Sequence, residues 1–207
     1  IPKGFATLCG GPGGTGKSLV GLHLQISAAS GTPFFGKQTA RGRTLGFYGE
    51  EDHAELQRRT KRICTGMNVP RNSISDAHSV PLHGLDAVLA VWDGKKMVAT
   101  DAYHQFEAEI ARLQPECVIV DNVARVFSGN ENDRMQVSQF VTLLESWAIK
   151  YDCAVLLMAH PAKAEGSEYS GSTAWESAVR SRLYFGAPDT DDDAHLHTDK
   201  RVLRVGK

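Results

Sequence analysis

Apolar and polar positions form two kinds of pattern that alternate along the chain. Short apolar runs, typical of buried strands, occupy residues 5–9, 44–48, 117–120 and 154–158. Apolar residues at three- and four-residue steps predict helices over residues 17–30, 52–64, 101–113 and 132–150. Strands that alternate with helices are typical of an α/β fold built on a mainly parallel, twisted sheet flanked by helices.

The C-terminal part of the chain changes this pattern. Two last strands, residues 181–185 and 201–205, flank the acidic turn PDTDDD, so we expect antiparallel strands at this end. We interpret the turn as a solvated hairpin tip, because its spacing fits no calcium-binding loop. Residues 67–98 show neither pattern clearly, and we expect short strands and turns there.

Composition narrows the class of protein. The 207 residues are enough for one core and too few for two domains of usual size, which predicts a single domain over residues 1–207. With 42% hydrophobic and 23% charged residues, the composition is that of a soluble globular protein. No apolar run approaches the roughly 20 residues of a membrane span, and the first residues do not resemble a signal peptide.

Charge and cysteine usage add two constraints. The four cysteines show no CxxC spacing, and three lie in or beside apolar runs, so we expect reduced thiols and a cytoplasmic protein. A formal net charge of −1 argues against DNA binding by a monomer. A ring that gathers a few basic residues in its pore is compatible with that charge.

Residues 10–18, GGPGGTGKS, carry the strongest chemical signal. They match the P-loop pattern G-x-x-x-x-G-K-[ST] in the required place, after a strand and at the start of a helix. Backbone N–H groups of such a loop surround phosphates, and the helix N-terminus favours negative charge. Lys17 is expected to reach the outer phosphates of ATP, and Ser18 to hold Mg²⁺. The predicted nucleotide contacts are Gly13, Gly14, Thr15, Gly16, Lys17, Ser18 and Leu19.

Two acidic positions complete the predicted site. Asp121 ends the apolar run 117–120 and is the candidate Walker B aspartate, the second ligand of Mg²⁺. The next residue is Asn122, where many ATPases carry the glutamate that activates water, so the base must come from elsewhere. The carboxyl ends of parallel strands meet at one rim of the sheet. We therefore expect Glu51 as general base and Glu50 as second candidate; the alternative is that both only stabilise a helix N-terminus.

Other sequence features favour an ATPase over related classes. His160 follows the strand 154–158, where it could sense the terminal phosphate or be purely structural. The chain has no NKxD motif, which argues against a GTP switch, and no LSGGQ motif, which argues against a transporter ATPase. An acceptor pocket and an arginine-bearing lid are not evident either, which disfavours a small-molecule kinase.

Taken together, these motifs resemble those of the RecA-like ATPases, in particular the branch of the RepA-type hexameric replicative helicases of plasmids. The resemblance extends from Gly11 to Lys207. It rests on residues 10–18, on Glu51-Asp52 with Leu56 and Arg59, and on residues 118–121, 159–163 and 171–180.

The resemblance implies roles for individual residues. It implies that Glu51 is the catalytic glutamate, that His160 senses the phosphate, and that Arg180 is an arginine finger directed at the neighbouring subunit. Arg59, with a one-residue offset, would lie near the adenine, and Lys207 would begin a last motif. An arginine finger contributes about 10³–10⁵ in rate, and supplying it from another subunit makes hydrolysis depend on assembly.

The resemblance also implies partners. A RepA-type protein would form a homo-oligomer, a hexameric ring with shared ATP sites, and would act on single-stranded DNA as a helicase. The DNA-contacting loops would be residues 127–134 and 164–170, which contain few lysines and arginines. That scarcity leaves a second hypothesis open, in which a RecA-like regulatory or recombination ATPase switches a protein assembly without unwinding DNA.

Overall fold

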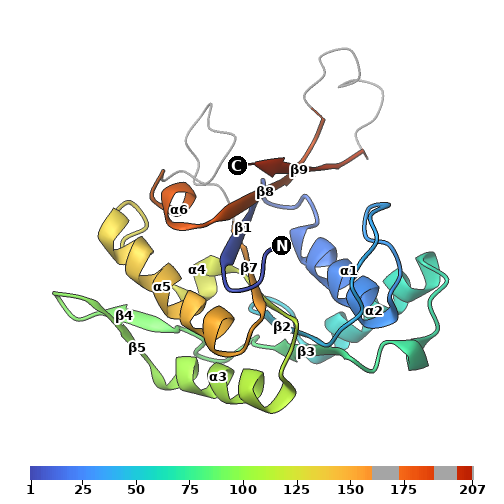
Figure 1. Ribbon diagram of the computed structural model, residues 1–207, viewed down its shortest axis with the longest axis horizontal. Helices are drawn as coiled ribbons and strands as arrows, with labels where there is room; N and C mark the ends of the chain where they lie inside the picture. The colour runs from blue at the N-terminus through green and yellow to red at the C-terminus, as the bar shows by residue number, and fades with distance from the viewer. Residues whose placement is uncertain (160–172, 189–199, 207) are drawn as a thin grey trace.

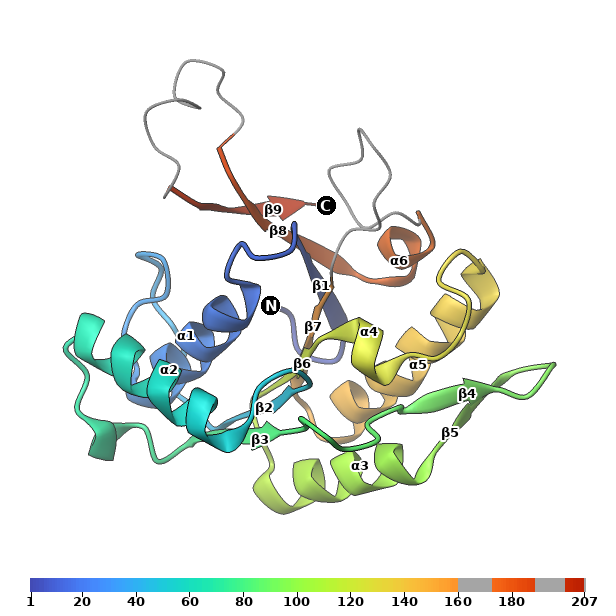
Figure 2. The ribbon, with the colours of Figure 1, turned by 180° about the vertical axis from the view of Figure 1, so that it is seen from behind.

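The computed structural model describes residues 1–159, 173–188 and 200–206. A seven-stranded sheet in the order β3-β2-β6-β7-β1-β8-β9 lies between two layers of helices (Figures 1 and 2). Its strands are β1 (Ala6–Gly10), β2 (Thr44–Tyr48), β3 (Ala77–Pro81), β6 (Cys117–Asp121), β7 (Ala154–Met158), β8 (Ser181–Gly186) and β9 (Val202–Gly206). The helices are α1 (Lys17–Ser30), α2 (His53–Gly66), α3 (Asp101–Leu113), α4 (Val123–Val126), α5 (Arg134–Lys150) and α6 (Thr173–Ala178).

The sheet has the predicted mixture of directions. β1, β2, β3, β6, β7 and β8 pair in parallel, whereas β9 runs antiparallel to β8. The expected α/β class, with antiparallel strands at the C-terminal end, is therefore confirmed. The turn PDTDDD between the last two strands falls largely outside the described residues.

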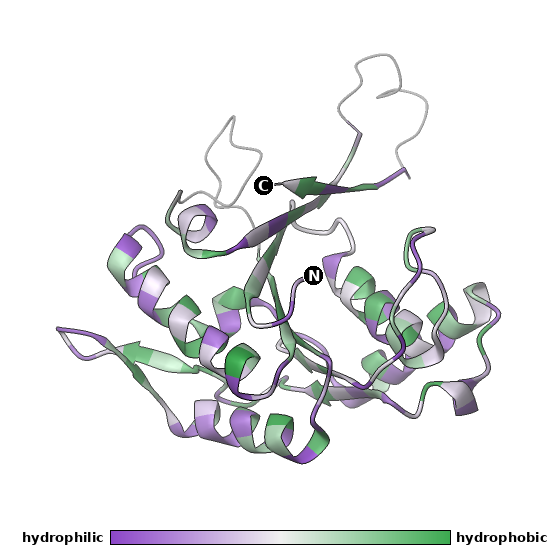
Figure 3. Ribbon diagram, in the orientation of Figure 1, coloured by the Kyte–Doolittle hydropathy of each residue, from purple (hydrophilic) through white to green (hydrophobic). Residues whose placement is uncertain are grey.

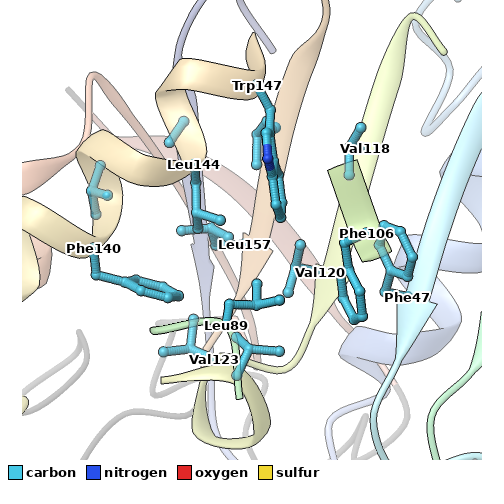
Figure 4. Close-up of a cluster of buried hydrophobic side chains, with 14 of the residues drawn as sticks. Phe47, Leu89, Phe106, Val118, Val120, Val123, Phe140, Leu144, Trp147 and Leu157 are labelled. Atoms are coloured by element: carbon cyan, nitrogen blue, oxygen red, sulfur yellow. The ribbon is translucent and has the colours of Figure 1, made fainter. Parts of the chain in front are cut away.

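Alternating side chains of the central strands build one core on each face of the sheet. Val118, Val120 and Leu157 point toward α3 and α5, while Ile119 and Leu156 point toward α1. The helices turn their hydrophobic sides to the sheet (Figure 3). On the larger core, Phe47 stacks on Phe106, with ring centroids 3.8 Å apart (Figure 4). Trp147 stacks on Tyr103, with ring centroids 4.7 Å apart.

Helix boundaries follow local capping. Asp52 caps α2, since its side chain accepts a hydrogen bond from the backbone N–H of Glu55 at 2.8 Å. Asp133 accepts from the N–H of Met135 at 2.9 Å, so α5 begins two residues later than the predicted start at residue 132. Each aspartate removes an otherwise unpaired donor of the first turn.

The segment that gave no clear pattern contains short elements. After β3 the chain forms a separate two-stranded antiparallel hairpin, β4 (Ala90–Trp92) and β5 (Met97–Ala99), which projects from the body (Figure 2). Its backbone joins the segment after α4 through a bridge between Ala90 and Phe127. No helix formed by the described residues has the length and apolar character needed to cross a membrane.

Candidate functional site

The carboxyl ends of β1, β2 and β6 bring the predicted site residues together. β2 and β6 pair in register at Tyr48 and Asp121, and β1 meets β7 at Cys9 and Met158. The segments that follow these strands surround a cavity of about 760 Å³. Its lining comprises Gly14, Thr15, Gly16, Lys17, Ser18, Leu19, Val20, His23, Glu50, Glu51, Arg58, Arg59, Arg62, Ile63, Gly66, Met67, Asp121 and Phe185.

The P-loop has a conformation that depends on glycine. Gly16 caps α1 with a left-handed backbone, φ 97°, which few side chains tolerate. At Gly11 a Cβ atom would lie 2.0 Å from the carbonyl oxygen of Phe185, so a larger residue would separate the loop from β8. The start of α1 thus lines the cavity with a helix N-terminus, which favours phosphate.

Lys17 is folded back onto the loop. Its Nζ donates to the carbonyl oxygens of Gly11 at 2.5 Å and Pro12 at 2.7 Å. Burial lowers the pKa of this lysine, while the negative charge of Asp121 opposes that effect. A phosphate in the cavity would offer the ammonium a charged acceptor in place of neutral carbonyls, and such hydrogen bonds are stronger.

Asp121 fits the role of a magnesium ligand. Burial raises the pKa of its carboxyl to about 6; nearby Glu51 and Glu50 act in the same direction, and a hydrogen bond with Ser18 opposes them. Its Oδ2 atom is buried without a hydrogen-bond partner among the described residues. A divalent cation would satisfy that oxygen and offset the carboxylate charge, and Ser18 beside it supplies the hydroxyl that P-loop enzymes use.

Glu51 and Glu50 have different environments. Glu51 is 5% exposed, and its Oε1 accepts a hydrogen bond from Nη1 of Arg59. Its Oε2 is buried without a hydrogen-bond partner in the described structure. Glu50 instead accepts a hydrogen bond from Nδ2 of Asn122 at 2.7 Å. Of the two candidate bases, Glu51 is the buried one, and its free oxygen is shielded from solvent, whereas Glu50 is exposed.

Arg180 lies away from the nucleotide cavity. It directly precedes β8, whose Ser181 pairs with Thr7 and whose Tyr184 pairs with Gly10 beside the P-loop. At about 3.3 Å per residue, roughly 13 Å of strand separates Arg180 from Tyr184. The exposed guanidinium lies over the ring of Phe5, 5.7 Å from its centroid.

Part of the predicted site lies outside the described structure, and the cavity contains residues that the sequence did not predict. His160, the loop 164–170 and Lys207 lie outside the described residues. The cavity also includes Arg58, Arg62 and Phe185, which were not predicted. The two arginines share a face of α2 with Arg59, so the basic helical pattern could have revealed them. Phe185 gives no such signal, since only the pairing of β8 with β1 brings it near.

Comparison with known proteins agrees with this geometry. Residues 1–166 match the family model AAA_25, described as AAA domain. No curated protein matches the chain. The mainly parallel sheet with its P-loop is consistent with a RecA-like core, and members of such families bind nucleotide, usually with Mg²⁺. Since the match spans most of the chain, including the P-loop and Asp121, the protein belongs to the AAA_25 family of P-loop ATPases.

Proposed function

We propose that the protein hydrolyses ATP as a RecA-like motor of the RepA type and that it acts on single-stranded DNA as a ring-forming replicative helicase. One observation carries the hydrolytic part: Lys17, Asp121 and Glu51 line the same cavity, although they lie at or after the ends of three different strands. The motor part is supported by the resemblance of the motifs as a set, and residues 1–207 would form one ATPase domain.

Each residue at the cavity would have a distinct task. Lys17 would exchange its two backbone carbonyl partners for the outer phosphates of ATP. Ser18 and Asp121 would hold Mg²⁺, which neutralises charge on the phosphates when bound. The Oε2 atom of Glu51 would accept a hydrogen bond from the attacking water and orient it in line with the terminal phosphoryl group. His160 remains the proposed sensor of that group.

Replacement of Glu51 by glutamine tests the hydrolytic part. Glu51→Gln keeps the shape of the side chain but loses the carboxylate, so we expect turnover to fall by about 10²–10⁴. Binding of a fluorescent ATP analogue should change little, because the P-loop is intact. Turnover equal to that of the wild type would show that another group activates water.

The mode of action needs a second experiment. A helicase should hydrolyse ATP faster with single-stranded DNA, and the stimulation should weaken as salt rises. The few basic residues in the loop 127–134 favour the alternative, a regulatory or recombination ATPase that switches a protein assembly. ATPase rates that do not respond to an oligonucleotide at low salt would support that alternative.

A further inference from the structure

Arg59 lies between two carboxylates at the edge of the nucleotide cavity. Its Nη1 donates to Oε1 of Glu51, and its Nε donates to Oε1 of Glu55 at 2.5 Å. Arg58 holds the same Glu55 through two hydrogen bonds of 2.6 Å. The guanidinium of Arg59 is thus fixed from two sides, and one of them is Glu51.

The two carboxylate oxygens of Glu51 have different environments. Oε1 is occupied by Arg59, whereas Oε2 is buried without a hydrogen-bond partner in the part of the chain that the structure describes. Glu51 itself precedes α2, and Arg59 is on the second turn of that helix. The carboxylate is therefore tied to helix α2 through Arg59, in addition to the segment that carries Glu51.

We propose that Arg59 is a positioning residue that holds Oε1 of Glu51 so that Oε2 is directed at the attacking water. The inference rests on the function proposed above, in which Glu51 orients that water. It assigns Arg59 a different task from the adenine contact that the sequence resemblance implies. In phosphoryl transfer, catalysis depends mainly on position, so an anchor for the carboxylate matters more than a stronger base.

The charges around Arg59 support positioning over contact with the base. A guanidinium that moved to the adenine would have to leave Glu51, whose side chain is only 6% exposed. Both oxygens of that buried carboxylate would then lack a partner, which is strongly unfavourable. Arg58 and Arg62 line the same cavity and can face a nucleotide without releasing Glu51.

Replacement of Arg59 should separate kcat from KM. A carboxylate misplaced by about 1 Å can cost roughly 10²-fold in rate, so we expect Arg59→Ala to lower kcat by about 10- to 100-fold. The KM for ATP should stay within about threefold of the wild-type value, because the P-loop contacts persist. Millimolar guanidinium should restore part of the rate. A large rise in KM with unchanged kcat would overturn the proposal in favour of a nucleotide contact.

Two further variants guard against loss of folding. Arg59→Lys keeps the positive charge but cannot bridge both carboxylates, so it should fold and still lose kcat. Arg112→Ala is the matched control, because Arg112 forms a 2.7 Å ion pair with Glu109 on the outer side of α3 and is remote from the cavity. We expect its kcat and KM to equal those of the wild type. Full activity of a folded Arg59→Lys would contradict a two-sided anchor.

A double variant distinguishes the inference from the function on which it rests. In a Glu51→Gln background, Arg59→Ala should cause no further loss if it acts through the carboxylate. Losses that multiply would show that Arg59 acts independently of Glu51. Full turnover of Glu51→Gln alone would instead refute the assigned base, whatever Arg59 does.

Discussion

At the scale of single residues, the site concentrates charge where water is scarce. Asp121 is 4% exposed and shares its surroundings with Glu50 and Glu51. Such a carboxylate is unfavourable in the protein without its cation, and the pKa of about 6 expresses that cost. Binding of Mg²⁺ and nucleotide would remove it, so the residues that prepare the site for catalysis destabilise the empty protein.

Asp121→Asn should therefore stabilise the protein without ligand while weakening magnesium-dependent nucleotide binding. The folded pKa of Asp121 is raised from 3.8 to about 6, so its contribution to stability is greatest below pH 3.8 and is lost as the pH rises to about 6. The upper limit of this loss is about 3 kcal/mol, and we expect the variant to gain about 1–3 kcal/mol at pH 7.5.

Urea unfolding in EDTA, from pH 4 to 8, measures this effect. The difference in free energy of unfolding between variant and wild type should grow with pH and level off above about pH 6.5. A difference that stays constant over this range would mean that the carboxylate is not strained by burial.

At the scale of elements, α3 and α5 are joined through aromatic packing. Trp147 on α5 is fully buried and stacks against Tyr103 and Phe106 of α3. Its indole Nε1 has no hydrogen-bond partner among the described residues, which is a cost within an otherwise well-packed core. Trp147 belongs to the same core cluster as Val118 and Val120 of β6, the strand that ends in Asp121 (Figure 4).

Truncation of Trp147 should accordingly be severe. We expect Trp147→Ala to lower the free energy of unfolding by about 3–5 kcal/mol, because it leaves a cavity between the helices. Trp147→Phe should cost less, since it also removes the unpaired donor. Ile149→Ala is the matched control on the same helix, at a position that is 72% exposed, and should change stability by under about 0.5 kcal/mol. Equal losses for Trp147→Ala and Ile149→Ala in urea unfolding would contradict this account.

The sequence predicts elements better than contacts. The strands 44–48 and 154–158 were correct to the residue, because continuous apolar runs between helices indicate buried parallel strands. Short strands were expected within residues 67–98, but the positions of β4 and β5 could not be assigned, since strands of three residues are too short for a period-two pattern. Because the carboxyl ends of parallel strands meet at one edge of a sheet, the sequence also predicted that Glu51 and Asp121 lie close together, and both line the same cavity.

Pairings within the site could not be predicted in the same way. Arg59 meets Glu51 across the N-terminus of α2, where a helix cap separates them and helical spacing does not apply. Phe185 reaches the cavity only because β8 pairs with β1, and the order of strands in a sheet cannot be read from local apolar patterns. The positions of the motifs can thus be predicted from the local sequence, whereas the residues that contact them depend on the tertiary structure.

At the scale of the whole molecule, the sheet separates two candidate parts of one active site. The P-loop lies at the carboxyl end of β1, and Arg180 lies at the amino end of its neighbour β8. Under the proposed function, Arg180 would complete the cavity of an adjoining subunit. A homo-oligomer with shared sites, such as a hexameric ring, would bring these two edges together.

Mixed subunits test this arrangement. Arg180→Ala should bind nucleotide normally but lose about 10³-fold in turnover, because the transition-state charge lacks its guanidinium. Lys17→Ala should lose turnover because its own cavity cannot hold the phosphates. In a mixture, some interfaces would combine the intact cavity of an Arg180→Ala chain with Arg180 from a Lys17→Ala chain. These interfaces would be complete, so activity should exceed that of either variant alone. Steady-state ATPase rates, recorded while one variant is titrated into the other, measure this gain, and light scattering confirms that the mixtures assemble.

Assembled mixtures with no gain in rate would show that Arg180 does not act between subunits. If the rate does rise, its dependence on the mixing ratio reports how many interfaces must be complete at once.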